Sequence, residues 1–381
     1  MLRGQMPAEE EQATGYSPVY YPGTTAPGQA GTVTLAPGEE HAGVDFQLQR
    51  VAVARLDGIL INPTGQPLQN LQITLVNSGS AVPGIDRGSA RPDSEGRFRM
   101  SNVVPGQYRV IARGTLNAPG PPTPPSPPAT GRQTAGPIRP DPMRFWATAD
   151  VVVDGRNLTG VVLTLQPGMT VSGRVAFDGT TPAPPDLTRV RVTLSPDVSG
   201  LPGELASAAN GRVDASGRFT IAGVVPGKYR VTGSGSVNGW QVGSAMIDGQ
   251  DTLDFSMEVK PAQNVSGAVI TFTDRQSELS GTLVNERGQP APDYTIVVYP
   301  ADERYWMPQS RRIRTTRPAT DGRFTFGNLP PGDYRLTPIL DVEPGAWYDP
   351  AFLRQLDAAA VRVSIGEGEK KTQNFQVSAG R

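Results

Sequence analysis

Apolar and polar residues alternate along much of this chain, and one alternating stretch occurs three times at identical internal spacing. The copies span residues 96–110, 217–231 and 322–336. Each begins with Gly-Arg-Phe, alternates apolar with polar residues, reaches Pro-Gly, and continues with Tyr-x-apolar. A period of two is typical of a half-buried strand. Pro followed by Gly predicts a type II turn, because Pro presets φ and Gly accepts a positive φ. Each copy therefore predicts strand, turn, strand.

The Tyr of each copy follows the turn directly, at the start of the second strand. This position is typical of a tyrosine corner, in which the ring packs inside the sandwich and the hydroxyl bonds to nearby backbone. We expect a structural role for all three, because residue type and spacing repeat together. The three residues are Tyr108, Tyr229 and Tyr334.

Further strand signals flank each copy. A short segment ending in Gly, a turn and an alternating strand precede it, and a closing pair of strands follows. About seven strands per copy, with turns at close spacing, predict an all-β fold of tandem Ig-like or prealbumin-like β-sandwich domains. The predicted domains are 51–168, 169–277 and 278–381. Residues 1–50 contain only a closing pair and predict the end of a truncated preceding repeat.

Short joins separate the predicted domains, so we expect a semi-rigid rod. The Pro-rich segment 118–142 lies inside the first domain, where it predicts an extended surface loop of polyproline character. A docking site for a proline-binding module is the alternative for this segment. One helix is predicted over 350–360, with Asp349 as its cap and Pro350 first. Helix should account for under about a tenth of the chain.

Composition narrows the function classes. The 381 residues carry a formal net charge of −1, which gives no reason to expect nucleic acid as a partner. The 44 Gly and 38 Pro favour turns and short strands over helices. Cysteine is absent, which excludes disulfides and thiol catalysis. No apolar run is long enough to span a membrane directly. The first residues have no apolar core typical of a signal peptide, so the chain is cytoplasmic or its true beginning is missing.

The repeated motifs resemble the carboxypeptidase regulatory-like domain family, a prealbumin-like (transthyretin-like) β-sandwich often found in tandem. The pattern Val-Ser-Gly-x-Val, Gly-Arg-Phe and Pro-Gly-x-Tyr stands at Val171, Gly217, Pro226 and Tyr229, and recurs nearly throughout the chain. The resemblance implies a secreted, periplasmic or surface-exposed bacterial protein of many repeats. It transfers no catalytic residues, since the module carries none.

No enzyme chemistry is indicated by the residues themselves. The one histidine, His41, lies in a turn without the partners of a catalytic triad. No cluster of acidic residues and histidine has the spacing of metal ligands, and no Gly-rich segment has the context of a phosphate loop. We therefore expect no catalytic site, no metal and no cofactor.

Two groups of residues are candidates for binding. Aromatic residues outside the repeated motif could stack on sugars or anchor an interface, or could cover the ends of the sandwiches. An Arg-rich stretch, 304–317, could track a polyanion or form the solvated face of a strand. The candidate ligand or interface contacts are Trp146, Trp240, Trp306, Trp347, Tyr20 and Tyr21.

The N-terminal segment carries apolar residues that have no predicted covering strands: Val33, Leu35, Val44, Phe46 and Leu48. We expect that a missing domain half lies upstream. The alternatives are packing on the first domain, disorder, or strand pairing with another copy.

The function predicted is a non-catalytic, extracytoplasmic structural or adhesive protein, with other copies, surface proteins or glycans as partners. A carbohydrate-binding accessory region of an exported enzyme, or the periplasmic part of a receptor or transporter, is the alternative.

Overall fold

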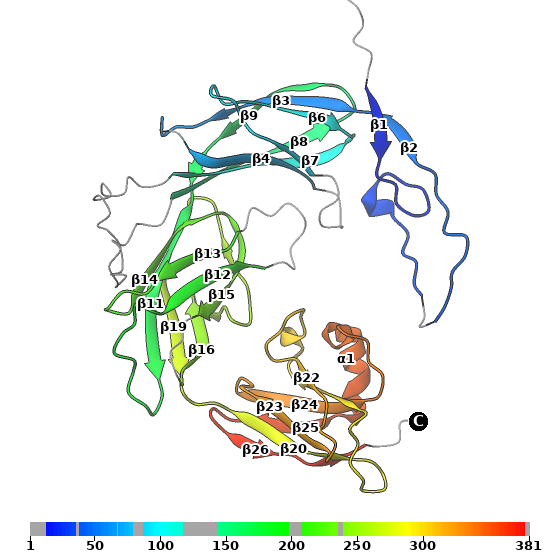
Figure 1. Cartoon of the computed structure of the whole chain (residues 1–381), viewed down its shortest axis with the longest axis vertical. Coiled ribbons are helices and arrows are strands. Elements are labelled where there is room, and N and C mark those ends of the chain that lie inside the picture. The colour runs from blue at the N-terminus through cyan, green and yellow to red at the C-terminus, as the bar shows by residue number, and fades with distance from the viewer. Residues whose placement is uncertain are drawn as a thin grey trace, which may run out of the picture.

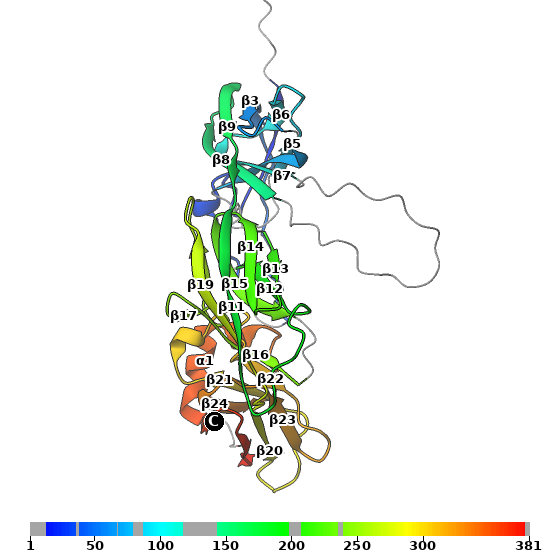
Figure 2. The same cartoon turned by 90° about the vertical axis from the view of Figure 1, so that its left-hand side faces the viewer.

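The chain is described here by a computed structural model. The structure describes residues 13–35, 38–66, 68–78, 87–116, 143–197, 207–234 and 239–377. The predicted polyproline loop at 118–142 lies outside the described residues. Three β-sandwiches follow one another along a curved path, as Figure 1 shows, and the turned view in Figure 2 shows how elongated the molecule is. The fold is nearly all β, as the alternating pattern predicts.

The first sandwich packs a five-stranded sheet on a three-stranded one. The larger sheet has the order β10-β8-β7-β4-β5, and the smaller has the order β6-β3-β9. Strand β3 runs antiparallel to β6 and parallel to β9. The bounds are β3 Ala54–Ile61, β4 Gln69–Asn77, β5 Arg87–Ala90, β6 Arg97–Val103, β7 Gly106–Leu116, β8 Met143–Val153, β9 Leu158–Thr164 and β10 Gln166–Pro167.

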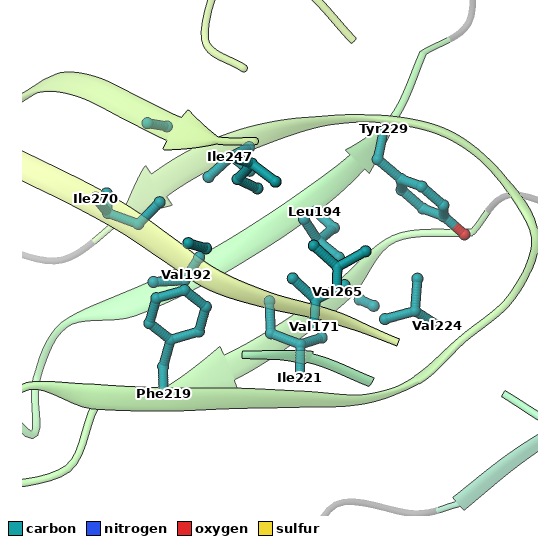
Figure 3. Close-up of a cluster of buried hydrophobic side chains, with 14 of the residues drawn as sticks. Val171, Val192, Leu194, Phe219, Ile221, Val224, Tyr229, Ile247, Val265 and Ile270 are labelled. Carbon is teal, nitrogen blue, oxygen red and sulfur yellow. The ribbon is translucent and has the colours of Figure 1, made fainter. Parts of the chain in front are cut away.

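The second sandwich has sheets of order β14-β11-β19-β16-β17 and β13-β12-β15-β18. Its core lies between the sheets and includes Val192, Phe219 and Ile270 (Figure 3). Again the first strand runs parallel to a late one, β11 beside β19. The bounds are β11 Met169–Asp178, β12 Arg191–Pro196, β13 Ala209–Arg212, β14 Arg218–Val224, β15 Gly227–Ser234, β16 Gln241–Ile247, β17 Gln250–Asp251, β18 Met257–Val259 and β19 Val265–Thr273.

The third sandwich pairs a sheet β23-β20-β26, with β27 also on β20, and a sheet β22-β21-β24-β25. The predicted helix is confirmed as α1 Pro350–Leu356, where the Asp349 carboxylate accepts from Ala351 N at 2.8 Å. The bounds are β20 Glu278–Val284, β21 Thr295–Pro300, η2 Glu303–Tyr305, β22 Arg314–Thr316, β23 Arg323–Gly327, β24 Gly332–Ile339, η3 Ala346–Tyr348, η4 Asp357–Ala359, β25 Val361–Ile365, β26 Lys370–Thr372 and β27 Phe375–Gln376.

Glycine in the first strand of each sandwich permits its close parallel neighbour. A Cβ on Gly58 would lie 2.5 Å from Val161 O, one on Gly173 2.1 Å from Ala268 O, and one on Gly281 2.0 Å from Gln373 O. Real Cβ atoms do not approach a carbonyl oxygen so closely. The small-Gly segment that opens each predicted domain is therefore required by the pairing of first and closing strands.

The repeated turn differs in detail from the one predicted. Gly227 and Gly332 both have φ of 151°, whereas the third position of a type II turn has φ of about 80°. These two glycines still adopt a positive φ, which favours Gly, whereas Gly106 of the first copy has no positive φ. A second special position precedes the Pro, where Asn102, Gly223 and Asn328 have φ of 59°, 71° and 58°. Asn and Gly tolerate this left-handed conformation best.

The N-terminal segment does not form the predicted closing pair. Its strands are β1 Thr14–Ser17 and β2 Gln49–Ala52, which pair with each other beside the first sandwich (Figure 1). None of the described residues between 31 and 48 lies in a strand. Leu35, Phe46 and Leu48 are exposed, and Val33 and Val44 are half-buried. The alternation in this segment is therefore that of an extended chain without a sheet partner.

Candidate functional site

The three repeated tyrosines are buried and donate their hydroxyls to the carbonyl four residues earlier. Tyr108 bonds Val104 O at 2.9 Å, Tyr229 bonds Val225 O at 2.8 Å, and Tyr334 bonds Pro330 O at 2.6 Å. Burial raises the pKa of Tyr334 to about 12, so its hydroxyl stays protonated and can donate. Each bond ties the strand after the turn to the residue before the Pro-Gly pair. This geometry supports a structural role for all three.

The joint between the first and second sandwiches is apolar and encloses Trp146. Its ring is 6% exposed and packs with Val76, Ile111 and, from the second sandwich, Val225. Beside it, Arg144 on β8 donates to Ala208 O at 2.7 Å across the joint. Trp146 is thus an interface residue between sandwiches of one chain. Its ring is not available to an external ligand.

Trp306 and Trp347 belong to a second, smaller core in the third sandwich. Trp306 is 7% exposed, donates from Nε1 to Pro300 O at 2.7 Å and meets Tyr299 edge-on at 5.7 Å. Trp347, in η3, is half-buried against the same cluster, which includes Leu353 of α1. Together these residues cover the outer face of the β21–β24 sheet. The Trp306 ring is therefore enclosed within the third sandwich, which leaves little of it for contact with a ligand.

Tyr20 and Tyr21 form part of a local turn in the N-terminal segment. Tyr20 N donates to Thr24 O at 2.7 Å, and Gly31 N donates to Tyr21 O at 2.7 Å. Both side chains are half-buried. Both belong to the N-terminal segment, whereas the remaining aromatic candidate, Trp240, packs against the core of the second sandwich.

The Arg-rich stretch crosses the joint between the second and third sandwiches. Arg311 Nε lies 2.8 Å from Asp254 Oδ1, and its Nη2 lies 2.9 Å from Asp254 Oδ2. Arg312 Nε lies 3.0 Å from the same Oδ2. Arg311 also bonds Asp251 at 3.0 Å and Gly243 O at 3.1 Å. Two adjacent arginines of the third domain thus converge on one carboxylate of the second.

The charged groups at this joint are paired with one another: Arg311 and Arg312 bond Asp254, and Arg311 also bonds Asp251. The Asp254 side chain is 2% exposed and that of Arg312 is 12% exposed. Burial alone would raise the pKa of Asp254, but the hydrogen bonds and charges of Arg311 and Arg312 outweigh it and hold this pKa below its usual value. Arg312 also lies 4.4 Å from the centre of the Tyr305 ring. Neither earlier interpretation, a polyanion track or a solvated strand face, describes these two arginines, although Arg314 in β22 is exposed.

Trp240 lines an open depression of about 730 Å³ at the end of the second sandwich. The indole is half-buried and meets Phe177 edge-on, with ring centres 5.0 Å apart. The other walls are the 180–186 loop, Arg189 and Asp274. Trp240 is therefore an aromatic candidate outside the repeated motif that lines a depression wide enough to admit a small molecule.

Asp274 is held in this depression by two threonines. Its Oδ2 accepts from Thr181 N and Thr181 Oγ1, both at 2.7 Å, and from Thr180 N at 2.9 Å and Thr180 Oγ1 at 3.1 Å. Oδ1 accepts from Thr180 N at 3.0 Å. The Thr181 hydroxyl is the largest contributor that lowers the pKa of Asp274 to about 2. The carboxylate is therefore ionised at neutral pH and acts only as an acceptor.

The part of the chain that the structure describes has neither a metal-binding cluster nor a membrane-spanning helix. No group of three or more His, Cys, Asp or Glu residues there has the geometry to hold a metal ion. No helix among the same residues has the length and apolar character needed to cross a membrane.

Known proteins were compared at three levels. No protein-family model matches the chain, and no curated protein matches it. Among solved structures, the Bacillus anthracis TIE protein is 13% identical, with a TM-score of 0.20, over 87% of this chain and 53% of that one. This chain thus spans about half the length of that protein.

Two pilins also resemble the chain. A streptococcal ancillary pilin is 12% identical with a TM-score of 0.25, over 86% of this chain and 100% of the pilin. The major pilin subunit of Bacillus cereus is 10% identical with a TM-score of 0.21, over 85% of this chain and 99% of the pilin. Identities and scores this low do not assign the chain to a family.

Sequence reasoning found Trp240 but missed Asp254, Asp274 and Gly179. Asp254 lies in a turn and Asp274 directly after β19, both outside the repeated motif, and their partners are 57 and 94 residues away. No local pattern marks such a pair. By contrast, each copy of the motif has Asn or Gly three residues before its Pro, at Asn102, Gly223 and Asn328. This repeated residue choice is a sequence signal from which the left-handed conformation could have been predicted.

Proposed function

We propose that this chain is a non-catalytic structural or adhesive protein that acts outside the cytoplasm, at the cell surface, in the periplasm or in the extracellular space. Its sandwiches form a stack whose joints are fixed. The observation that carries this is the second joint, where Arg311 and Arg312 share Asp254. A buried carboxylate that loses its cationic partners is strongly destabilised, so this joint favours the docked arrangement.

The first joint supports the same function by different means. It buries the Trp146 ring against Val225, and burial of a large apolar side chain stabilises by about 1.5–3 kcal/mol. The first and second sandwiches share an apolar patch, and the second and third share an ion cluster. Because both joints hold their sandwiches in place, the orientation of one end of the chain fixes that of the other. That property suits a spacer or shaft, which must hold its ends apart.

The resemblance to carboxypeptidase regulatory-like domains supports placement outside the cytoplasm. Protease treatment of intact source cells tests it: an external protein is cleaved while a cytoplasmic marker survives. Survival of the chain together with the marker in both whole cells and osmotically opened cells would contradict the proposal.

Self-association through the N-terminal segment is a further part of the proposal. The exposed Leu35, Phe46 and Leu48 support it, because exposed apolar side chains favour burial by a partner. Light scattering on residues 1–381 and 51–381 tests it. Assembly of the longer chain alone identifies the segment as the association element, and two monomers at all concentrations exclude it.

A second candidate function is a carbohydrate-binding region of a larger exported protein. The Trp240 depression favours it, since that depression combines an aromatic ring with a fixed carboxylate.

A further inference from the structure

The Trp240 depression is built around one glycine. A Cβ on Gly179 would lie 2.3 Å from Asp274 Oδ1 and 2.7 Å from the Trp240 ring. The carboxylate and the indole therefore approach the same point of the backbone, at the end of β11. A larger residue at 179 would move one or both of them.

Both groups are held before any ligand arrives. The Trp240 ring is fixed against Phe177 of β11, and Asp274 is fixed by the backbone and hydroxyl groups of Thr180 and Thr181. A group that is already ordered loses little conformational freedom on binding. The depression thus offers a rigid apolar surface and a rigid acceptor side by side.

The hydrogen bonds within the protein leave one oxygen of the Asp274 carboxylate, Oδ1, able to accept a further hydrogen bond. Oδ2 of Asp274 accepts four hydrogen bonds, whereas Oδ1 accepts one, from a donor that it shares with Oδ2. An ionised carboxylate has about four acceptor positions in total over its two oxygens. Oδ1 is therefore the oxygen that can take a hydroxyl from a ligand.

The charges in the depression select the ligand class. Asp274 and Asp186 are both acidic, and Arg189 Nε lies 3.4 Å from Asp186 Oδ2, which it partly neutralises. The depression is left with an excess negative charge, which repels anionic sugars. A ring with apolar C–H faces and several hydroxyl donors fits an indole beside a carboxylate.

We propose that this depression is a binding site for a neutral saccharide, with one sugar ring stacked on Trp240 and a hydroxyl donated to Asp274 Oδ1. Arg189, at the rim, contacts the neighbouring sugar. This site would supply the ligand of an adhesive protein, so the saccharide proposal rests on the adhesive form of the proposed function. The rigid joints do not depend on the saccharide site.

The full chain titrated by calorimetry tests the site. The probes are maltoheptaose, cellohexaose, chitohexaose, mannohexaose and an acidic oligogalacturonate. At least one neutral probe should bind at about 1 mM or below, and the acidic probe should not bind. Trp240→Ala should weaken the binding by about tenfold or more. Tyr16→Ala, which removes an exposed aromatic ring from strand β1, is the matched control and should leave the affinity unchanged.

Arg189→Ala provides a second variant, because the Arg189 side chain is 80% exposed and its loss should not disturb folding. It should weaken binding by about threefold. Circular dichroism confirms that each variant is folded. If no neutral probe binds, or if binding is the same in wild type, Trp240→Ala and Arg189→Ala, the saccharide site is wrong. Rigid joints measured on the same protein would then leave the structural function standing.

Discussion

Arg311 and Asp254 form a two-point ion pair across the joint between the second and third sandwiches, with N–O distances of 2.8 and 2.9 Å. The two residues are 57 positions apart and belong to different domains. Their side chains are 26% and 2% exposed. A bidentate pair of this kind fixes direction as well as distance, so the third sandwich is oriented relative to the second.

Asp254→Ala should loosen this joint strongly. It leaves Arg311 and Arg312 without their shared carboxylate, and breaking a buried pair in this way costs about 3 kcal/mol or more. Denaturant unfolding should then show the third sandwich separating at lower denaturant than in wild type. Arg156→Ala, which removes an 86% exposed side chain, is the control and should change the midpoint little. Equal midpoints for Asp254→Ala and Arg156→Ala would contradict the assignment.

Stability of the same joint should fall in acid. The pKa of Asp254 is lowered in the folded protein, so its ionised form contributes stability above the unfolded pKa of about 3.9. That contribution is lost as the pH falls through the lowered folded value. The stability difference between wild type and Asp254→Asn should therefore be largest near neutral pH and shrink below about pH 4. Thermal unfolding of both proteins across this range measures it. A difference that is constant with pH would show that the charge of Asp254 is not what stabilises the joint.

Tyr229→Phe should lower the free energy of unfolding by about 1 kcal/mol, because Val225 O loses its 2.8 Å hydrogen bond in a buried place. Tyr16→Phe is the matched control, since Tyr16 is 62% exposed. Denaturant midpoints of both variants decide the matter. An unchanged midpoint for Tyr229→Phe would mean that the corner hydrogen bond adds no stability.

Gly281→Ala should destabilise the third sandwich by about 3 kcal/mol, because its Cβ would collide with Gln373 O and separate β20 from its parallel neighbour. Gly327→Ala, in the adjacent strand β23, adds a Cβ that meets no atom within 4 Å and should be nearly neutral. Thermal unfolding compares the two. Similar melting temperatures would show that the close approach of these strands is not required.

The repeated pattern predicted the fold because the residues that specify the strands and the turn lie close together in the sequence. Alternation around Phe219, the Pro-Gly turn and the Tyr229 position lie within fifteen consecutive residues. The joints could not be predicted in this way, since Asp254 meets Arg311 only after two domains have folded and docked. Trp146 illustrates the same limit: its sequence position resembles that of Trp240, yet packing encloses one ring and leaves the other in a depression. The N-terminal segment shows that alternation at Val44, Phe46 and Leu48 does not make a strand without a neighbouring strand to pair with.

The most direct test of fixed joints is a distance measured between two sandwiches in solution. The chain has no cysteine, so a pair introduced as Thr220→Cys and Thr325→Cys can be spin-labelled specifically. These threonines occupy the same exposed position in β14 and β23. Pulsed electron paramagnetic resonance should give one narrow distance distribution, which broadens when Arg311→Ala and Arg312→Ala are added. A broad distribution in the otherwise unaltered chain, or one that those two substitutions do not change, would contradict a rigid stack held at this joint.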